Sequence, residues 1–181
     1  MIQTTHVGSL PRGAVVADTL FAQEKELPLD PAGFDAVMAE ATITIVAKQR
    51  EIGIDIPSDG ETSKISYATY IKDRLTGFSG DSPRRVPADL MEYPAYAEKI
   101  GRSGGTPTYR RPRCTGPITV KSLAPLHADI ARMKAGMAAA GYGTGFMNSA
   151  SPGVIALFQP NDFHPDTDAY LADLAEAMAA E

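Results

Sequence analysis

The sequence predicts an α/β fold in which short strands alternate with helices around a parallel sheet. Three observations predict it. Strand-like segments run into loops that contain Gly or Pro, amphipathic helical segments follow those loops, and this order recurs three or four times along the 181 residues. The chain is long enough for one domain with a sizeable core, and it contains no internal repeat.

The first third of the chain predicts one strand and two helices. Residues 2–7 are rich in β-forming residues and predict a strand that ends in a Gly-Ser-Leu-Pro loop. A helix is expected over residues 13–24. A second helix is expected over residues 31–52, because Asp30 is a good N-cap, apolar residues recur with a 3.6-residue period, and Gly53 is a good stop.

The middle of the chain predicts a second strand and a long loop. Residues 54–57 form the strand, and residues 67–75 predict a short helix. Residues 79–108 are rich in Gly, Pro and charge, so we expect an extended loop region with a helical piece near residues 95–100. Loops of that length in a compact domain tend to be functional.

The last third continues the alternation. Residues 113–120 contain strand-like sequence around residues 115–119, residues 125–140 predict a helix, and residues 145–147 are a short strand candidate. A helical turn is expected over residues 151–158, and a last helix is expected from residue 166 onward. A complete (β/α)8 barrel needs eight such units and about 250 residues, so this pattern is shorter than a full barrel.

Composition excludes several classes of function. The net charge of −5 argues against a nucleic-acid-binding protein, whose surface is usually basic. A single cysteine, Cys114, permits no internal disulfide, which favours a reducing compartment. The first residues do not have the pattern of a signal peptide, and no apolar run approaches the roughly 20 residues that cross a membrane. We therefore expect a soluble cytoplasmic protein without a membrane partner.

Four segments along the chain form a recognisable set of motifs. They are residues 5–12 (THVGSLPR), 49–55 (QREIGID) with 58–61 (SDGE), 115–119 (TGPIT), and 151–153 (SPG) followed by 170–181. Each motif alone is weak, whereas their order and spacing make the set specific. Together they resemble the catalytic barrel of cobalamin-independent methionine synthase. The resemblance is greatest to the short, single-barrel members, often labelled methionine synthase II, which also resemble epoxyalkane:coenzyme M transferase.

This resemblance implies roughly the first half of a (β/α)8 TIM barrel of the methionine synthase and uroporphyrinogen decarboxylase type. Residues 1–181 are then the N-terminal part of a single TIM-barrel catalytic domain. A half-barrel exposes an open strand edge, which a complementary half-barrel or another copy of the chain would cover.

The resemblance also implies a reaction. A methyl group passes from 5-methyltetrahydrofolate (polyglutamate) to the thiol of homocysteine in methionine biosynthesis, and zinc activates the thiol as a thiolate. The zinc ligands of the family are His, Cys and Glu residues of later strands, so we assign no metal ligand in this sequence. The partner that the resemblance predicts is a small-molecule thiol.

Five residues near two strand ends are candidate site residues. In the family, the position of Glu61 binds the substrate ammonium, and the positions of Gly8 and Ser9 hold the amino-acid end of the thiol substrate. Asp59 is expected to be a supporting acid. His6 is the candidate catalytic residue, because an imidazole can help to deprotonate a thiol. From the residues alone, each also fits a structural role in a tight turn or a solvated loop.

Cys114 has a reactive and a structural interpretation. Its neighbours Arg110, Arg111 and Arg113 could lower the pKa of the thiol, but a strand position favours a buried structural thiol. The arginine cluster itself fits either a contact to an anionic donor, such as a folate tail, or a solvated basic turn.

The remaining histidines and several large side chains are expected to be structural. We predict that His127 and His164 are surface or helix-capping residues. The residues predicted to pack in the core are Tyr67, Tyr70, Met133 and Met137.

Three alternatives to methionine synthesis stay open. Methionine synthase typically lacks a histidine at the position of His6, which favours another thiol alkyltransferase of the epoxyalkane:coenzyme M transferase type. A barrel decarboxylase of the uroporphyrinogen type shares the fold, although its arginine-rich N-terminal motif is not evident. A non-catalytic half-barrel that binds a ligand or partner through its open edge is the third alternative.

Overall fold

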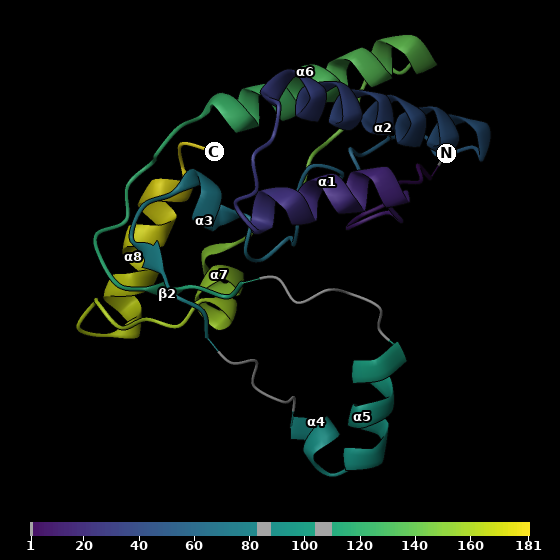
Figure 1. Cartoon of the computed structure of the whole chain (residues 1–181). Coiled ribbons are helices and arrows are strands. Elements are labelled where there is room, and N and C mark those ends of the chain that lie inside the picture. Colours follow the sequence, from purple (N-terminus) through teal and green to yellow (C-terminus); the bar gives the residue numbers. More distant parts are fainter. Residues whose placement is uncertain (1, 83–87, 104–109) are drawn as a thin grey trace.

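The two longest helices form one layer of the molecule. The computed structural model describes residues 2–82, 88–103 and 110–181. In it, α2 (Pro31–Glu51) lies beside α6 (Ala124–Ala140), and α1 (Ala14–Glu24) packs against α2 (Figure 1). The helices predicted over residues 13–24, 31–52 and 125–140 are therefore confirmed.

The sequence signals at the ends of these helices act as expected. The side chain of Asp30 accepts hydrogen bonds from the backbone N–H groups of Ala32 and Gly33, at 3.2 and 2.9 Å. These bonds satisfy two of the N–H groups that a helix start leaves unpaired. Gly141 ends α6 with φ 71°, in the left-handed region where glycine is favoured.

A small residue lets α2 and α6 approach closely. A Cβ atom at Gly136 of α6 would lie 3.3 Å from the Cβ of Val46 in α2. Val46, Met133 and Tyr142 form the buried cluster at this contact, and Met137 packs against it. The prediction that Met133 and Met137 belong to the core is confirmed.

Three of the predicted strand segments lie side by side and run parallel. Thr5 bridges Ile56, and Ser58 bridges Phe146, both in parallel register. The backbone N–H of Phe146 donates to the carbonyl of Pro57 at 3.1 Å, and the N–H of Ile56 donates to that of Thr4 at 3.1 Å. The carboxyl ends of these three segments therefore meet at one edge.

The prediction of regular strands in these segments is wrong, because each segment pairs at isolated bridges. One reason is visible at Ser58, whose backbone N–H and carbonyl both bond to the side chain of Gln49 in α2, at 3.0 and 2.8 Å. A helix side chain thus satisfies backbone groups that a neighbouring strand would otherwise pair.

Regular strands occur in one short antiparallel pair within the described part of the chain. β1 (Phe78–Ser79) pairs with β2 (Arg113–Cys114), with Phe78 opposite Cys114. The strand-like sequence predicted within residues 113–120 begins with β2, but residues 115–119 do not continue it as a strand. Pro117 lacks an N–H, and Thr115 turns back to donate to the carbonyl of Gly77 at 2.7 Å. The fold is mixed α/β, and the described residues do not close a barrel.

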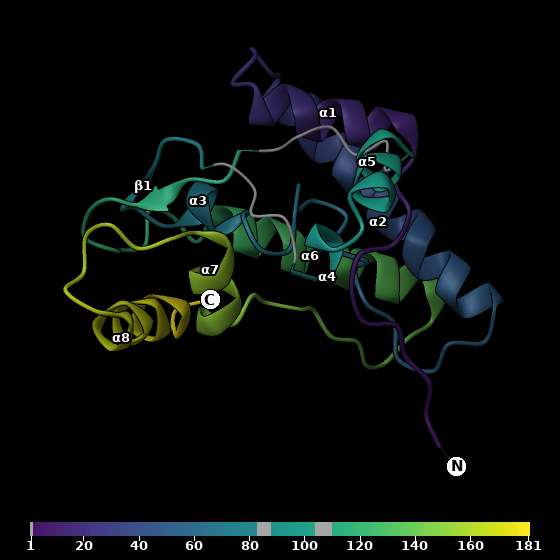
Figure 2. The ribbon, with the colours of Figure 1, turned by 90° about the horizontal axis from the view of Figure 1, so that it is seen from below.

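The second layer is built from the C-terminal helices. α7 (Pro152–Phe158) packs against α8 (Thr167–Met178), close to α3 (Ile71–Arg74), as the two views show (Figures 1 and 2). The predicted helices at residues 151–158 and from residue 166 are confirmed, whereas the helix predicted over residues 67–75 shortens to α3. The largest buried apolar cluster lies here and includes Ile71, Cys114, Ile155, Tyr170 and Leu174.

The long segment predicted as a loop contains two helices. α4 (Ala88–Met91) and α5 (Pro94–Ser103) lie apart from the other helices in Figure 1, and α5 includes the predicted helical piece. Residues 83–87 and 104–109 of that segment lie outside the described residues. No helix in the described part of the chain is long and apolar enough to cross a membrane.

Two predictions of burial are wrong. Tyr67 is 48% exposed and contacts the edge of Phe158 with its ring, whereas Tyr70 is buried as expected. His164 is not a surface residue, because its side chain is 5% exposed and accommodated between Cys114 and Asp173. His127 is exposed, as predicted.

The Cys114 region is structural. The thiol is fully buried, which confirms the structural interpretation, and burial raises the pKa of Cys114. The arginines do not gather at the thiol. Arg110 pairs with Glu26 at 2.6 Å, Arg113 pairs with Asp162, and Arg111 donates to the backbone carbonyl of Phe158.

We expect Leu174→Ala to lower the free energy of unfolding by about 2–5 kcal/mol, because Leu174 is fully buried between α7 and α8. The matched control is Leu157→Ala on α7, where the side chain is 73% exposed and the change should stay within about 0.5 kcal/mol. Urea unfolding followed by circular dichroism measures both. Equal losses in the two variants would contradict this packing.

Candidate functional site

A left-handed turn follows the second parallel segment. Gly60 and Glu61 have φ angles of 61° and 54°, and the second value is uncommon for a residue with a side chain. The backbone N–H of Leu10 donates to the carbonyl of Gly60 at 3.0 Å, so the loop after the first segment is tied to this turn. Backbone strain of this kind persists where the surroundings hold it, and such positions cluster at binding sites.

Two side chains hold the turn at Glu61. Asp59 accepts a hydrogen bond from the backbone N–H of Glu61 at 3.1 Å. Arg12 donates to the backbone carbonyls of Glu61 and Lys64 at 2.8 and 2.6 Å. Burial lowers the pKa of Arg12, and the neighbouring carboxylates of Glu61 and Asp59 oppose that shift. The orientation of the Glu61 side chain is therefore set from both sides.

The Glu61 carboxylate is bound by residues from the other two segments. The Ser9 hydroxyl donates to one carboxylate oxygen at 2.5 Å, and the Asn148 amide donates to the other at 3.3 Å. Glu61 is 4% exposed, whereas Ser9 is exposed. Ser9, Glu61 and Asn148 each follow one of the three parallel segments, so their side chains meet where those segments end. In parallel α/β proteins, this edge is where ligands usually bind.

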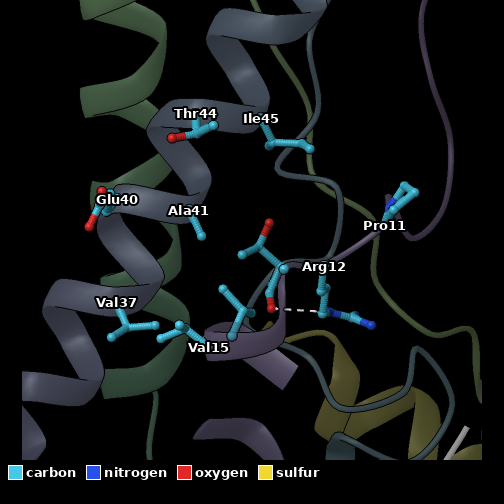
Figure 3. Close-up of a pocket in the computed structure, with 11 residues that line it drawn as sticks. Pro11, Arg12, Val15, Val37, Glu40, Ala41, Thr44 and Ile45 are labelled. Carbon is cyan, nitrogen blue, oxygen red and sulfur yellow. Dashed lines mark hydrogen bonds between the residues drawn. The ribbon is translucent and has the colours of Figure 1, made fainter. Parts of the chain in front are cut away.

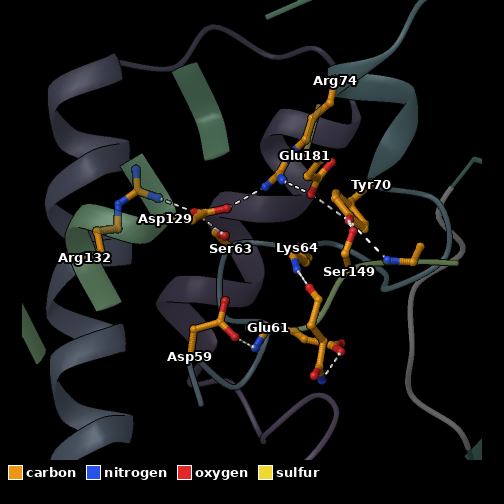
Figure 4. A network of polar contacts seen from close by, with 12 residues as sticks. Asp59, Glu61, Ser63, Lys64, Tyr70, Arg74, Asp129, Arg132, Ser149 and Glu181 are labelled. Atoms are coloured by element: carbon orange, nitrogen blue, oxygen red, sulfur yellow. Dashed lines mark hydrogen bonds and ion pairs between the residues drawn. The ribbon is translucent and has the colours of Figure 1, made fainter. Parts of the chain in front are cut away.

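A buried lysine lies next to this carboxylate. The ammonium group of Lys64 donates to the backbone carbonyl of Asn148 and lies over the Tyr70 ring, 4.8 Å from its centroid (Figure 4). Lys64 is 3% exposed. Asn148 therefore contacts the carboxylate of Glu61 with its side-chain amide and the ammonium group of Lys64 with its backbone carbonyl.

Asp59 is a buried acid beside this pair. It is 4% exposed, and burial raises the pKa of its carboxyl group, with the positive charge of Lys64 acting in the opposite direction. Its hydrogen bond to the Glu61 backbone fits the supporting role expected from the sequence.

A second polar network supports the site from the side of α6. The Asp129 carboxylate binds Arg74 at 2.6 Å, Arg132 at 2.8 Å and the Ser63 hydroxyl at 2.6 Å (Figure 4). Arg74 also pairs with Glu181, which accepts a hydrogen bond from the Tyr70 hydroxyl at 2.9 Å. Burial raises the pKa of Tyr70 to about 12. This network fixes the Tyr70 ring against which Lys64 lies.

The structure brings some of the predicted site residues together and leaves others apart. Ser9, Asp59 and Glu61 share the site. Gly8 adopts φ 101°, which allows the chain to turn directly before Ser9. His6 is half-buried, and its Nε2 atom is buried without a hydrogen-bond partner among the described residues.

Three residues of the site, Arg12, Lys64 and Asn148, are not predicted from the sequence. Arg12 and Lys64 lie inside or directly beside the motifs at residues 5–12 and 58–61, but basic residues in loops have no distinctive pattern. Asn148 follows the predicted strand at residues 145–147. A polar residue directly past a predicted parallel strand is the signal that could have found it.

A separate cavity of about 340 Å³ lies between α1 and α2 (Figure 3). Its wall is mostly apolar and includes Val15, Val37, Ala41 and Ile45. Arg12 also lines it and donates from its Nε atom to the carbonyl of Thr62 at 3.3 Å. The cavity lacks the acid and amide groups that meet at Glu61, so the candidate site is the cluster at the segment ends.

The described residues do not fit a metal ion. Within residues 2–82, 88–103 and 110–181, no group of three or more His, Cys, Asp or Glu side chains is arranged to hold one. The residues that meet at Glu61 can supply hydrogen bonds and charge pairing to a ligand.

Comparison with known proteins finds methionine synthases among the similar proteins. A methionine synthase from Sulfolobus acidocaldarius is 26% identical over 118 residues, which are 65% of this chain and 30% of that protein. A B12-independent methionine synthase from Shewanella sp. W3-18-1, solved in complex with selenomethionine, matches with a TM-score of 0.69 at 17% identity. A putative vitamin-B12 independent methionine synthase from Listeria monocytogenes matches with a TM-score of 0.60 at 19% identity. No protein-family model matches.

The chain is similar in sequence to a methionine synthase and in fold to B12-independent methionine synthases. The family resemblance expected from the sequence motifs is thereby confirmed. The structural matches cover 98% and 95% of this chain but 46% and 44% of the two solved proteins. The chain therefore spans less than half of the length of these relatives, and its fold corresponds to part of theirs.

We expect Arg74→Met to lower the free energy of unfolding by about 3–5 kcal/mol, because it leaves the buried carboxylates of Asp129 and Glu181 without their shared cation. Arg113→Met removes the exposed pair with Asp162 and should have little effect. Urea unfolding at pH 7 compares the two variants. A loss for Arg74→Met no larger than that for Arg113→Met would show that the network does not stabilise the fold.

We expect Asp59→Asn to stabilise the protein at neutral pH. Because the folded protein raises the pKa of Asp59 above its ordinary value of 3.8, the wild type binds the proton more tightly when folded and loses stability as pH rises through that range. The amide removes this dependence and can still accept the hydrogen bond from the Glu61 N–H.

Asp55→Asn is the matched control with the opposite sign. Hydrogen bonds from the Thr4 N–H and hydroxyl lower the pKa of Asp55, so its contribution is present above pH 3.8 and is lost as pH falls through its folded pKa. This variant should lose stability at neutral pH. Thermal unfolding between pH 3 and pH 8 tests both signs, and parallel curves for the two variants would refute the assignment.

Proposed function

We propose that this chain forms the amino-acid-binding part of a methyltransferase that transfers a methyl group from 5-methyltetrahydrofolate (polyglutamate) to the thiol of homocysteine. The observation that supports it is the chain of hydrogen bonds from Ser9 through Glu61 to Asn148, at the ends of three parallel segments. It occurs in a fold shared with B12-independent methionine synthases, one of which was solved with the amino acid selenomethionine.

The residue types fit the two charged groups of an amino acid. The Glu61 carboxylate can accept hydrogen bonds from a substrate ammonium, and charge-assisted bonds of this kind are strong. Ser9 offers an N–H and a hydroxyl to the substrate carboxylate, and Gly8 permits a close approach to the backbone. Because the Ser9 hydroxyl can rotate, it can leave Glu61 when the ligand arrives.

We assign His6 to the thiol end of the substrate. Its Nε2 atom is buried and has no partner among the described residues, so the nitrogen can accept a proton from a thiol. A histidine at this position also favours the second candidate, another thiol alkyltransferase of the epoxyalkane:coenzyme M transferase type. The two candidate functions differ in the thiol that accepts the alkyl group. In both of them, His6 faces that thiol.

The rest of the catalytic machinery is proposed to lie outside the described residues. The chain corresponds to less than half of each solved relative, so the remaining strands of a (β/α)8 barrel have no counterpart in it. We propose that those strands, from a complementary half-barrel or a second copy, pair with the open edge beside Thr5. A complementary half-barrel would also have to bind the zinc that the resemblance implies, since the described residues of this chain do not fit it.

We expect Glu61→Gln to weaken the binding of L-homocysteine and L-methionine by about 2–5 kcal/mol, because the substrate ammonium loses its buried carboxylate partner. Isothermal titration calorimetry on the intact protein measures this loss. Glu51→Gln, which alters an exposed pair with Lys48, is the matched control and should bind like the wild type. An intact wild-type protein that binds neither amino acid would refute the proposed function.

A further inference from the structure

Lys64 is a buried cation without a direct ion pair among the described residues. It is 3% exposed, and lysines are almost never fully buried unless they are paired. Its ammonium group contacts the carbonyl of Asn148 and the face of the Tyr70 ring. Among the described residues, no carboxylate lies within 4.0 Å of this ammonium group.

The neighbouring cations differ from Lys64 in this respect. Arg74 pairs with Asp129 and Glu181, and Arg132 pairs with Asp35 at 2.5 Å as well as with Asp129. These arginines are therefore satisfied within the protein and belong to the supporting network. The ammonium of Lys64 has capacity for an anion that the described residues do not supply.

Asn148 places this cation next to the proposed ligand-binding acid. Its side-chain amide donates to Glu61, and its backbone carbonyl accepts from Lys64. The anion and the cation are therefore separated by a single residue. A free amino acid carries an ammonium and a carboxylate on one carbon, so a site that binds both groups needs an anion and a cation that the ligand can reach together.

We infer that Lys64 binds the carboxylate of the ligand while Glu61 binds its ammonium, so that the site selects a zwitterionic amino-acid thiol. This inference rests on the proposed function and adds a specificity-determining residue to it. Ser9 and Gly8 then supply neutral donors to the same carboxylate, and Lys64 supplies the charge. A thiol with an anionic group and no ammonium would satisfy Lys64 but leave Glu61 without a cation.

The competing explanation is that Lys64 serves as an internal counter-charge. Asp59 and Glu61 are both buried nearby, and the positive charge of Lys64 acts on Asp59. A counter-charge would stabilise the empty site and influence every ligand alike. Carboxylate binding would influence only ligands that have a carboxylate, and this difference makes the two explanations separable.

The test compares three thiols in the intact protein by calorimetry. L-Homocysteine has both charged groups, 3-aminopropane-1-thiol lacks the carboxylate, and 4-sulfanylbutanoic acid lacks the ammonium. Lys64→Gln keeps a donor for the Asn148 carbonyl and removes the charge. We expect it to weaken homocysteine binding by about tenfold or more and to leave 3-aminopropane-1-thiol binding within about twofold of wild type. Glu61→Gln should show the converse pattern, with 4-sulfanylbutanoic acid unaffected.

Controls keep the test decisive. Lys48→Gln removes an exposed lysine and should change neither ligand series. Circular dichroism verifies that each variant folds, and Lys64→Met, which also removes the charge, replaces Lys64→Gln where the latter unfolds. The methionine variant is expected to weaken homocysteine binding and to leave 3-aminopropane-1-thiol binding unaltered.

Each outcome decides the matter. Equal weakening of homocysteine and 3-aminopropane-1-thiol by a Lys64 variant overturns the inference and favours the counter-charge. Unchanged homocysteine affinity overturns it as well, while the proposed function stands. A wild-type protein that binds none of the three thiols and no methionine overturns both proposals.

Discussion

The buried carboxylate of Glu61 is the constraint on which the arrangement of the site depends. A carboxyl group that is 4% exposed needs hydrogen-bond partners for both oxygens, and it obtains them from Ser9 and Asn148. These donors come from the loops after the first and third parallel segments. The hydrogen bonds to one carboxylate therefore hold the ends of three chain segments together. The left-handed backbone at Glu61 persists because Arg12 and Asp59 bind its carbonyl and N–H.

The helices supply what a wide sheet would otherwise provide. Gln49 of α2 binds both backbone groups of Ser58, directly before the Glu61 turn. Since α2 is packed closely on α6 through Gly136, the position of Ser58 is coupled to a rigid pair of helices. Asp129 of α6 reaches the same region through Ser63 and Arg74. The residues of the site are thus held in place mainly by contacts with the helices α2 and α6, and less by strand pairing.

Local signals in the sequence were sufficient for the helices and insufficient for the strands. Asp30 and Gly53 predicted the ends of α2 correctly because capping depends on a few neighbouring residues. The strands at residues 2–7 and 145–147 shrank to bridges, because strand length depends on partners far along the chain. Ser9 and Glu61 were found through motifs. Asn148 and Lys64 were missed, because their roles arise from contacts with residues more than 80 positions away.

Contacts with residues distant in the sequence also distinguish Arg74, which is paired inside the protein, from Lys64, which is proposed to bind a ligand. Arg74 and Lys64 are both buried cations beside Tyr70, at 4.7 and 4.8 Å from the ring centroid, and the sequence alone does not distinguish them. Arg74 has two carboxylate partners inside the protein, so its electrostatic interactions are complete when the protein is empty. Lys64 has a carbonyl and a ring, which solvate an ammonium only in part. A cation left in that state gains most from an anion that arrives with a ligand, and Glu61 beside it gains most from a cation. An amino acid brings both on one carbon.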